Sequence, residues 1–439
     1  MKPRLLMTIP LAAFFISCQT DPAARYSQGG TLGASVQSST KAVNYSISPR
    51  AGVEELVTLS LEHHPSLHAA QQKVSRLTAR AAQEKALPDP NARVSLGDLA
   101  QTAAGQVDTI VGVEQRIPFP GKLKAKGLAA QKEADAASAE LESLKLALAQ
   151  RVRIAYWSRY LAEQGLRTNL ESRDILNAIS DIVKKRVESN QANQADLLRI
   201  TSEISKIDKE IIIARQRSRI SGAMLNALLN RPAGASLPSP KRSSIPGESN
   251  LDALISRAES SHPSVLSGQA RLEAFRHRLR KARLENYPDL MVGVQRAWVS
   301  DSGLSPVADG SDQTMFTLGI NIPFWRAPRR AGIDEASAGI AEMQANIASS
   351  RSSLRQRVED AWLSAKSSRE IITLFETRLI PDARKAHELA LKSYSAGELS
   401  FVDVLDTWRT LLSLELQLEH NRASLGKASA ALKSAAAIY

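Results

Sequence analysis

An internal duplication, with a spacing of about 200 residues, constrains this chain more than any other feature. The pattern of each half predicts, in order, a helix, two strands, a long helix, a tight turn that we call a tip, and a further helix. Solenoid repeats have periods of roughly 20–50 residues, so this longer period indicates two halves of one body. Four short motifs of the first half return in the same order in the second: His64-Pro65-Ser66 as His262-Pro263-Ser264, Pro88-Asp89 as Pro288-Asp289, Ile117-Pro118-Phe119 as Ile322-Pro323-Phe324, and Asp196-Leu197-Leu198 as Asp403-Val404-Leu405.

The composition favours long helices over a sandwich or a doubly wound sheet. Charged residues make up 23% of the 439 residues and aromatic residues only 5%. The formal net charge of +12 raises the question of a nucleic-acid partner. Basic and acidic residues alternate along the predicted helices, however, which is typical of a solvated surface. We therefore expect no nucleic-acid partner.

The first residues predict export and a lipid anchor. Lys2 and Arg4 precede an apolar run at 5–16 that is shorter than the ~20 residues of a membrane span. Phe15-Ile16-Ser17-Cys18 is similar to a bacterial lipobox, and Cys18 is the only cysteine. We expect a lipoprotein signal peptide at 1–17, lipid attachment at Cys18 and a lipidated flexible tether at 18–50.

Two regions in each half have the period-two alternation of strands. The apolar positions of these segments alternate with glycine and polar residues over lengths that suit transmembrane β-strands. Soluble, half-buried hairpins are the alternative interpretation of the same pattern. The expected strands lie at about 92–98, 109–117, 289–299 and 314–322.

Helical periodicity fills most of the remaining chain. The first repeat is expected at 51–230, an equatorial linker at 231–250 and the second repeat at 251–439. Each long helix would measure about 100 Å, twice its neighbours, so pairs of short helices would stack end to end beside it, with the breaks near mid-height. The long helices are expected at 124–189 and 329–394, and the shorter ones at 53–86, 194–229, 252–286 and 401–435.

The connections after the long helices predict two tight helical hairpins. Asn190 and Gly397 end the long helices, and both residue types tolerate the left-handed conformation of a helix terminus. Asn193 and Ser400 then stand three residues before an acid, which is a capping arrangement. Both tips would lie at the end farthest from the strands.

Four strands cannot close a membrane barrel, because the smallest bacterial barrels have eight and an open edge leaves backbone groups unpaired in lipid. Three subunits would supply twelve strands. The expected fold is therefore mainly α with a small membrane β-barrel: duplicated helix-strand-strand-long helix-helix halves form a trimeric twelve-stranded barrel, continued by a periplasmic α-barrel.

These features resemble the TolC-like outer-membrane factor family, lipoprotein branch. The most specific matches are Ile117-Pro118-Phe119-Pro120-Gly121-Lys122, Tyr394-Ser395-Ala396-Gly397 and Val402-Asp403-Val404-Leu405-Asp406. The resemblance implies a homotrimer in the outer membrane of a Gram-negative bacterium, extending into the periplasm. It also implies a periplasmic adaptor protein, an inner-membrane transporter and a passive exit duct for small toxic solutes such as metal cations or drugs.

The resemblance also suggests roles for residues at the tips. Asp403 and Asp406 match an acidic pair that lines the constricted periplasmic mouth, although Asp403 could instead face the dipole of its helix N-terminus. In the first half, Arg199 occupies the position equivalent to Asp406. Leu399 occupies the position at which some relatives carry a basic residue that latches the closed mouth. The tip residues Asn190, Asn193, Gly397 and Ser400 would dock the adaptor.

Four aromatic residues near the strand ends are candidates for membrane-interface contacts, with ordinary packing as the alternative: Phe119, Trp298, Phe324 and Trp325. The seven histidines are scattered without metal-ligand spacing, so we expect no metal site and solvated helix positions. No catalytic motif is present, and we expect neither an enzyme nor a cofactor. A type I protein-secretion duct and a structural envelope-spanning lipoprotein remain the alternative functions.

Overall fold

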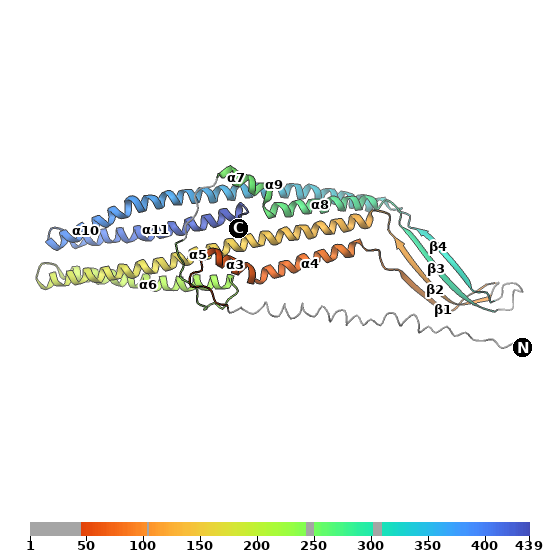
Figure 1. The fold of residues 1–439 in the computed structure, drawn as a ribbon, viewed down its shortest axis with the longest axis horizontal. Helices are drawn as coiled ribbons and strands as arrows, with labels where there is room; N and C mark the ends of the chain where they lie inside the picture. Colours follow the sequence, from red (N-terminus) through yellow and green to blue (C-terminus); the bar gives the residue numbers. More distant parts are fainter. Residues whose placement is uncertain (1–44, 103–104, 243–249, 302–309) are drawn as a thin grey trace.

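The computed structural model describes residues 45–102, 105–242, 250–301 and 310–439. The molecule is long and narrow, with one sheet at one end and two helical tips at the other (Figure 1). Nearly parallel helices lie side by side in the body between them, in the order α4-α5-α8-α9 near the sheet. Within the described ranges, no helix combines the length and the apolar character that a membrane span requires.

The helices fall into two similar sets, one from each repeat. In the first, α5 packs against α4 near the sheet and against α6 near the tips; in the second, α9 packs against α8, and α10 against α11. The two sets meet where α5 contacts α8 and α11. The bounds are α3 (Val53–His63), α4 (Pro65–Lys85), α5 (Lys122–Glu188), α6 (Gln194–Leu228), α7 (Leu251–Ser261), α8 (Pro263–Leu284), α9 (Arg326–Leu374), α10 (Ile380–Ala396) and α11 (Phe401–Ala435).

The expected single helices at 53–86 and 252–286 are wrong, since each is two helices. The breaks fall at His64 and His262, which adopt extended conformations before Pro65 and Pro263. A residue that precedes proline is disfavoured in the helical region, so the His-Pro pair ends one helix and starts the next. The duplicated motif is thus a helix break.

The expectation that the histidines are solvated helix positions is wrong for three of them. Nδ1 of His64 accepts a hydrogen bond from the Ser66 amide (3.2 Å), and His262 caps its helix in the same way. Burial lowers the pKa of both imidazoles below the usual value, with a smaller contribution from a nearby arginine in each case. His387 is also buried and contacts Thr407 of α11. Packing between helices, which the sequence pattern did not reveal, buries His262 and His387 and half-buries His64.

The second long helix is not uniformly α-helical. A π-helical segment, Phe375–Leu379, joins α9 to α10 just before Pro381. Proline has no amide hydrogen, and its ring clashes with the carbonyl four residues earlier, so a wider turn relieves both problems. Glu376 within this segment accepts hydrogen bonds from Arg242 of the linker (2.9 Å) and Arg422 of α11 (2.6 Å). The segment is therefore fixed to two neighbouring elements.

The four strands form one antiparallel sheet in the order β1-β2-β3-β4. Consecutive strands are neighbours, so β1 and β4 are the two edges. The strands differ from the expected ranges mainly at the far end, where β1 continues beyond residue 98 and β2 begins before residue 109. The bounds are β1 (Asn91–Thr102), β2 (Gly105–Ile117), β3 (Leu290–Ser300) and β4 (Gln313–Ile320).

The register gives the sheet two chemically different faces. Directly opposed residues of antiparallel strands share a face, and Val113 opposes Val294, which in turn opposes Phe316. Gly112 opposes Gln295 on the other face. The apolar face is Val94, Leu96, Val111, Val113, Ile117, Leu290, Val292, Val294, Phe316, Leu318 and Ile320, and many of these side chains are exposed.

The linker and the chain end meet the long helix at mid-height. The Lys241 amide donates a hydrogen bond to the Tyr156 hydroxyl of α5 (2.8 Å). The hydroxyl of Tyr439, the last residue, donates to the Glu142 carboxylate (2.7 Å). Figure 1 places the C-terminus at the middle of the body, near the break between α7 and α8. The breaks of the short helices are thus covered by the linker and the chain end.

Candidate functional site

The two helical tips are built by their terminal residues. Asn190 and Gly397 have φ of 57° and 86°, the left-handed conformation that ends a helix. The Asn193 side chain accepts a hydrogen bond from the Ala195 amide (3.1 Å) and so caps α6. The Ser400 hydroxyl caps α11 by accepting from the Asp403 amide (3.4 Å). These contacts satisfy helix amides that would otherwise lack partners.

One arginine connects the two tips, and the sequence analysis missed it. The guanidinium of Arg186, near the end of α5, donates to the main-chain carbonyl of Tyr394 in α10. It also donates to the Gln191 carbonyl (3.2 Å) and lies over the Tyr394 ring, 4.7 Å from the ring centre. We call this set of interactions the tip contact. Arg186 had no recognisable signal in the sequence, because two of its partners are backbone carbonyls and Tyr394 is about 200 residues away.

An apolar cluster lies next to the tip contact and includes Tyr394. It joins α5 and α6 of the first repeat to α10 and α11 of the second. Tyr394 and Phe401 are both buried, with ring centres 5.6 Å apart. The largest other members are Leu176, Ile179, Val183, Ile200, Ile207, Ile211, Val404, Leu405 and Trp408. The two hairpins therefore meet through a shared core as well as through Arg186.

The carboxylates of the tips differ between the two repeats. Asp196 forms an ion pair with Arg199, one turn along α6 (3.1 Å). Asp403 accepts a hydrogen bond from the Ser400 hydroxyl (2.6 Å). Asp406 is exposed, one turn beyond Asp403 on the same side of α11, and has no ion pair among the described residues. Only the second repeat therefore presents an acidic pair that forms no ion pair among the described residues; Arg409, three residues after Asp406, pairs with Glu203 of α6 instead.

A buried carboxylate joins the sheet to the helices. Asp289, between α8 and β3, accepts hydrogen bonds from Lys122 (2.7 Å), Arg116 (2.6 Å) and the Phe119 amide (2.9 Å). Burial alone would raise the pKa of this carboxyl, but the hydrogen bonds from Lys122, Phe119 and Arg116 outweigh it and hold the pKa at about 2. All three donors come from the first repeat, so Asp289 ties the two halves together at this corner.

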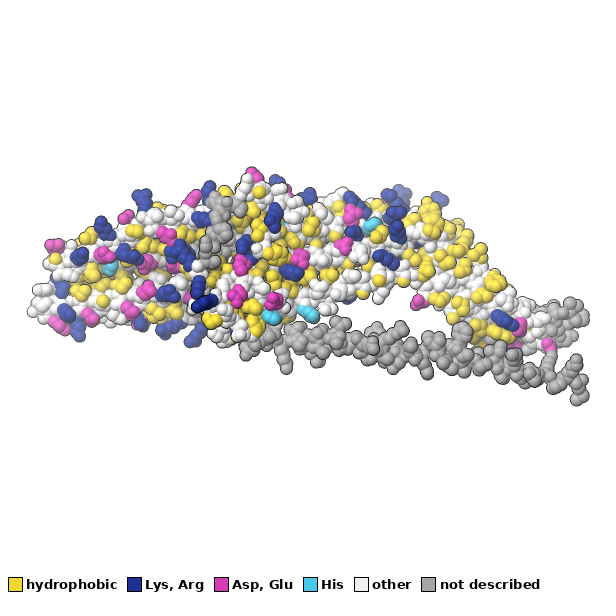
Figure 2. All heavy atoms as spheres, viewed as in Figure 1, with side chains coloured by type: hydrophobic (Ala, Val, Ile, Leu, Met, Phe, Trp, Pro, Cys, Tyr) yellow, Lys and Arg dark blue, Asp and Glu magenta, His cyan; other side chains and the backbone are white. Residues whose placement is uncertain are grey.

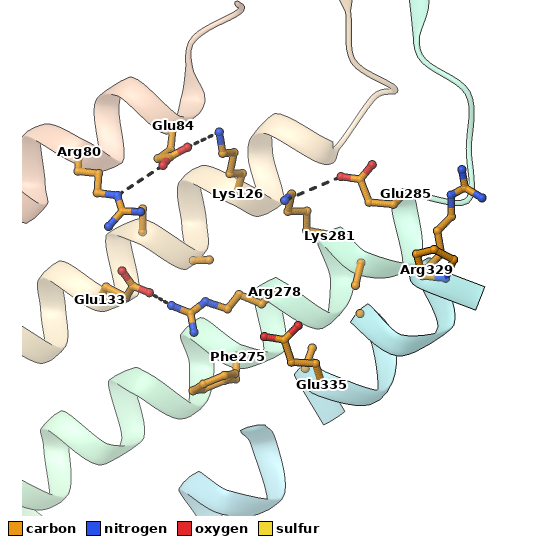
Figure 3. A pocket seen from close by; sticks show the side chains of 16 residues that line it. Arg80, Glu84, Lys126, Glu133, Phe275, Arg278, Lys281, Glu285, Arg329 and Glu335 are labelled. Atoms are coloured by element: carbon orange, nitrogen blue, oxygen red, sulfur yellow. Dashed lines mark hydrogen bonds and ion pairs between the residues drawn. The ribbon is translucent and has the colours of Figure 1, made fainter. Parts of the chain in front are cut away.

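A cavity of about 580 Å³ lies among α4, α5, α8 and α9 near the sheet. Figure 3 shows that cations and anions alternate along its wall. Glu84 pairs with Lys126 and Arg80, and Glu133 pairs with Arg278. Because these charges are paired within a helix or across neighbouring helices, we assign no ligand to this cavity. Among the described residues, no three His, Cys, Asp or Glu side chains are grouped as metal ligands.

The four candidate interface aromatics occupy both ends of the sheet. Phe324 and Trp325 are 76% and 74% exposed where β4 leads to α9. Phe119 stacks on Tyr287 at the same end (4.6 Å between ring centres). Trp298 lies near the far end of β3, about 26 Å from Leu290 at the extended-strand rise. The candidate lipid-attachment residue Cys18 and the tether as far as residue 44 lie outside the described residues.

Comparison with known proteins identifies the family. The model of the family "Outer membrane efflux protein" matches residues 56–231 and 254–437, well over half of the chain. The chain is a member of the outer membrane efflux protein family. Its similarity to the TolC-like channels, expected from the corner and tip motifs, is confirmed, and the family is one of channels and not of enzymes.

Two characterised proteins resemble this outer membrane efflux protein along most of their length. The pyoverdine export outer membrane protein OpmQ of Pseudomonas putida is 24% identical over 99% of this chain and 97% of its own. The cobalt-zinc-cadmium resistance protein CzcC of Cupriavidus metallidurans is 22% identical over 83% of this chain and 85% of its own. Both are similar to this efflux protein across both repeats.

Solved structures of the same fold agree with the family assignment. CusC superimposes with a TM-score of 0.72 at 19% identity, covering 90% of this chain and 99% of CusC. VceC of Vibrio cholerae gives a TM-score of 0.73 at 18% identity, covering 88% of this chain and 95% of VceC. The mainly helical body with a small sheet is therefore the fold of this efflux protein family, as expected from the sequence.

Proposed function

We propose that three copies of this outer membrane efflux protein form the passive exit duct of a tripartite efflux pump. The sheets would join edge to edge as one closed wall in the outer membrane, and the helices would continue it into the periplasm. The α5 helix of 67 residues would extend the duct by about 100 Å. Energy for transport would come from the inner-membrane transporter, because a duct has no chemistry of its own.

The observation that carries this proposal is the sheet. It has one exposed face that is mainly apolar, one face rich in small and polar residues, and two edge strands that each pair with a single neighbour. In a bilayer, unpaired edges leave backbone hydrogen-bonding groups without partners, so β1 of one copy must pair with β4 of the next. A closed twelve-stranded wall with its apolar face outward satisfies both the edges and the apolar side chains.

The aromatic residues at the two ends of the sheet support its placement in the membrane. The distance of about 26 Å between their two levels along β3 is close to the ~25 Å height of the apolar band of outer-membrane proteins. Phe119, Phe324 and Trp325 would lie at the periplasmic interface, and Trp298 at the outer one. Cys18 would carry the lipid that anchors each copy to the same membrane.

The tips would form the periplasmic mouth of the duct. Asp403 and Asp406 of three copies would put six carboxylates around one narrow opening, which favours cations. The tip contact would hold the mouth closed by joining the two hairpins of each copy. Asn190, Asn193, Gly397 and Ser400 would present the turns to the adaptor protein.

Small toxic solutes are the proposed cargo. OpmQ is named for pyoverdine export and CzcC for cobalt, zinc and cadmium resistance. An acidic mouth is compatible with metal cations and with cationic drugs, and the duct would accept what its transporter delivers. The choice between these cargoes would then rest with the adaptor and the transporter.

Conductance in planar bilayers tests the proposal. Purified protein should migrate as a detergent-resistant trimer, and this trimer should produce discrete single-channel steps. A soluble monomer without β-structure in detergent would contradict the duct and favour the structural envelope-spanning lipoprotein. Loss of secretion of a large protein substrate, with unchanged resistance to metals and drugs, in a deletion strain would favour the type I secretion duct.

A further inference from the structure

A group of unpaired cations surrounds the helix ends next to the sheet. Residues 271–285 contain six basic and two acidic residues, and residues 326–333 contain three basic and none acidic. Several of these cations are paired, such as Arg278 with Glu133. Four of the cations in these two segments, together with Lys124 of α5, are exposed and have no ion pair within the part of the chain that the structure describes: Arg280, Arg283, Arg326 and Arg330. We call these five residues the basic belt.

The belt residues share one side of the helical layer. At 3.6 residues per turn, Arg280 and Arg283 of α8 lie on the opposite side from Arg278 and Lys281, which line the cavity of Figure 3. The same geometry places Arg326 and Arg330 opposite the cavity-lining face of α9, and Lys124 opposite that of α5. The belt is therefore distinct from the cavity and its paired charges.

The belt adjoins the exposed apolar surface of the sheet. Arg326 directly follows the exposed Phe324 and Trp325, and Arg330 lies about 6 Å further along α9. Figure 2 shows Lys and Arg side chains gathered where the helices meet the sheet, beside the hydrophobic surface of the strands. A headgroup layer is roughly 5–8 Å thick. Cations at this distance from an apolar band lie at headgroup depth.

At the N-termini of α5 and α9, the belt cations oppose the helix dipole, whereas Arg280 and Arg283 lie toward the C-terminal end of α8, where a cation is favourable. Lys124 and the arginines of α9 stand in or next to the first turn of their helices, which contain no acid and no side-chain cap. A cation at a helix N-terminus is unfavourable, because this end carries partial positive charge. At the tips, by contrast, α6 and α11 begin with an acid and a side-chain cap. An external anion would remove this conflict at the sheet end only.

We infer that the basic belt binds the phosphate groups of anionic phospholipids in the periplasmic leaflet of the outer membrane. This inference rests on the proposed placement of the sheet in that membrane. Arginine forms paired hydrogen bonds with phosphate oxygens, and clusters of basic residues next to a membrane segment favour anionic headgroups. Three copies in a trimer would complete a ring of fifteen cations around the duct, holding its depth and orientation in the bilayer.

Lipid retention by the full-length protein tests this inference. Trimers in mixed micelles with equal amounts of phosphatidylglycerol and phosphatidylcholine would be analysed by native mass spectrometry. We expect at least about tenfold preference for phosphatidylglycerol, since one basic side chain near an anionic surface contributes about fivefold in binding. The variant R280Q/R283Q/R326Q/R330Q should bind both lipids equally, whereas the corresponding four lysine substitutions should keep the preference.

A matched variant controls for net charge. Lys184, Arg215, Arg217 and Arg219 are also exposed and lack ion pairs among the described residues, but they lie on α5 and α6 away from the sheet. Their replacement by glutamine should leave the lipid preference intact. Equal lipid binding by the wild-type protein, or equal loss in both glutamine variants, would overturn the inference. If the fourfold variant does not assemble, the single variants R280Q and R330Q replace it. Each should show a preference for phosphatidylglycerol between those of the wild type and of a protein that binds both lipids equally.

Two further measurements separate this inference from the proposed function. Protein that does not float with neutral phosphatidylcholine vesicles would contradict the membrane placement itself. Protein that inserts into neutral vesicles without preferring phosphatidylglycerol would contradict only the basic belt. Co-sedimentation with peptidoglycan that is lost in the fourfold glutamine variant, without any lipid preference, would assign the belt to the cell wall and overturn the lipid assignment.

Discussion

At the scale of single residues, equivalent positions of the two repeats have diverged. Asp289 is buried among Lys122, Arg116 and the Phe119 amide, whereas Asp89, at the equivalent position of the first repeat, is exposed. Both follow the same proline, so the local sequence does not distinguish them. The difference arises because the donors to Asp289 lie on the other repeat.

Replacement of Asp289 by asparagine should destabilise the protein. Removal of one partner of a buried ion pair costs about 3–5 kcal/mol, because Lys122 would remain buried without its counter-charge. Thermal unfolding of the purified trimer would measure the loss. Asp89→Asn is the control and should leave the unfolding temperature unchanged; an equal effect of both substitutions would show that the Asp289 contacts do not stabilise the corner.

The low pKa of the Asp289 carboxyl predicts that the folded protein loses stability in acid. The folded pKa of about 2 is below the usual value of 3.8, so the stabilisation is fully present above about pH 4 and is lost as the pH falls toward 2. The size of the effect is about 2 kcal/mol for a shift of this order. Unfolding curves between pH 5 and pH 2 should therefore converge for wild type and Asp289→Asn as the pH is lowered.

The acidic pair at the second tip should control ion selectivity. Asp403→Asn together with Asp406→Asn would remove six charges from the proposed mouth of a trimer, so we expect the preference for cations to fall. The reversal potential in a salt gradient across a planar bilayer measures this preference. Asp196→Asn is the control, since Asp196 is already paired with Arg199; unchanged selectivity in the double variant would place the pair outside the ion path.

At the scale of helices and strands, most elements follow from local pattern, and their ends from capping. The tips combine left-handed residues with side-chain caps, and the His-Pro motif breaks the short helices at the same place in both repeats. Contacts between elements, in contrast, do not follow from local sequence pattern. Arg186 joins α5 to α10 through a backbone carbonyl and a ring face, and neither has a sequence signature.

Loss of the tip contact should open the proposed mouth. Arg186→Ala removes hydrogen bonds from a charged donor and a cation–π interaction, together about 2–3 kcal/mol. We expect larger or more frequent open states in single-channel recordings. Lys185→Ala removes the same charge from the neighbouring exposed position and should leave the conductance unchanged. Identical recordings from both variants would argue against a closing role for Arg186.

The helix cap at His262 should make this end of α8 sensitive to acid. Burial and Arg357 lower the folded pKa of His262, so its contribution to stability is present above about pH 6.5 and is lost as the pH falls through the lower folded value. His262→Asn keeps a cap acceptor without the titration and should flatten the dependence of unfolding temperature on pH, while His262→Ala should cost about 1 kcal/mol. His277→Asn, on the same helix without a capping contact, is the control.

At the scale of the whole molecule, the chain has the surface features of one subunit of a larger assembly, which we propose is a trimer. Its sheet has an exposed apolar face and two edges with a single neighbour each, and Figure 2 shows the hydrophobic surface that this leaves on the strands. In the helical body, long helices lie beside pairs of shorter ones; α4 and α6 together match the length of α5. These properties are explained together if the copies associate around a common axis.

A charge on the apolar face should prevent assembly in the membrane. Phe316 is 84% exposed in the middle of β4, and Phe316→Arg would cost about 2–4 kcal/mol per copy in lipid. Met315→Arg places the same charge on the opposite face of the same strand, where water would fill the duct. We expect detergent-resistant trimers from the Met315 variant and few from the Phe316 variant; the reverse order would mean that the faces of the sheet are assigned the wrong way round.

The sequence by itself determined the duplicated order of elements, the alternation of the strands and the family, because these depend on periodicity, turn residues and short motifs. The tertiary structure decided that Asp289 is buried while Asp89 is not, that Arg186 joins the tips, and that five cations collect beside the sheet. Each of these depends on atoms from segments far apart in the chain. Local patterns carry no information about such partners, because the packing of one repeat against the other brings them together.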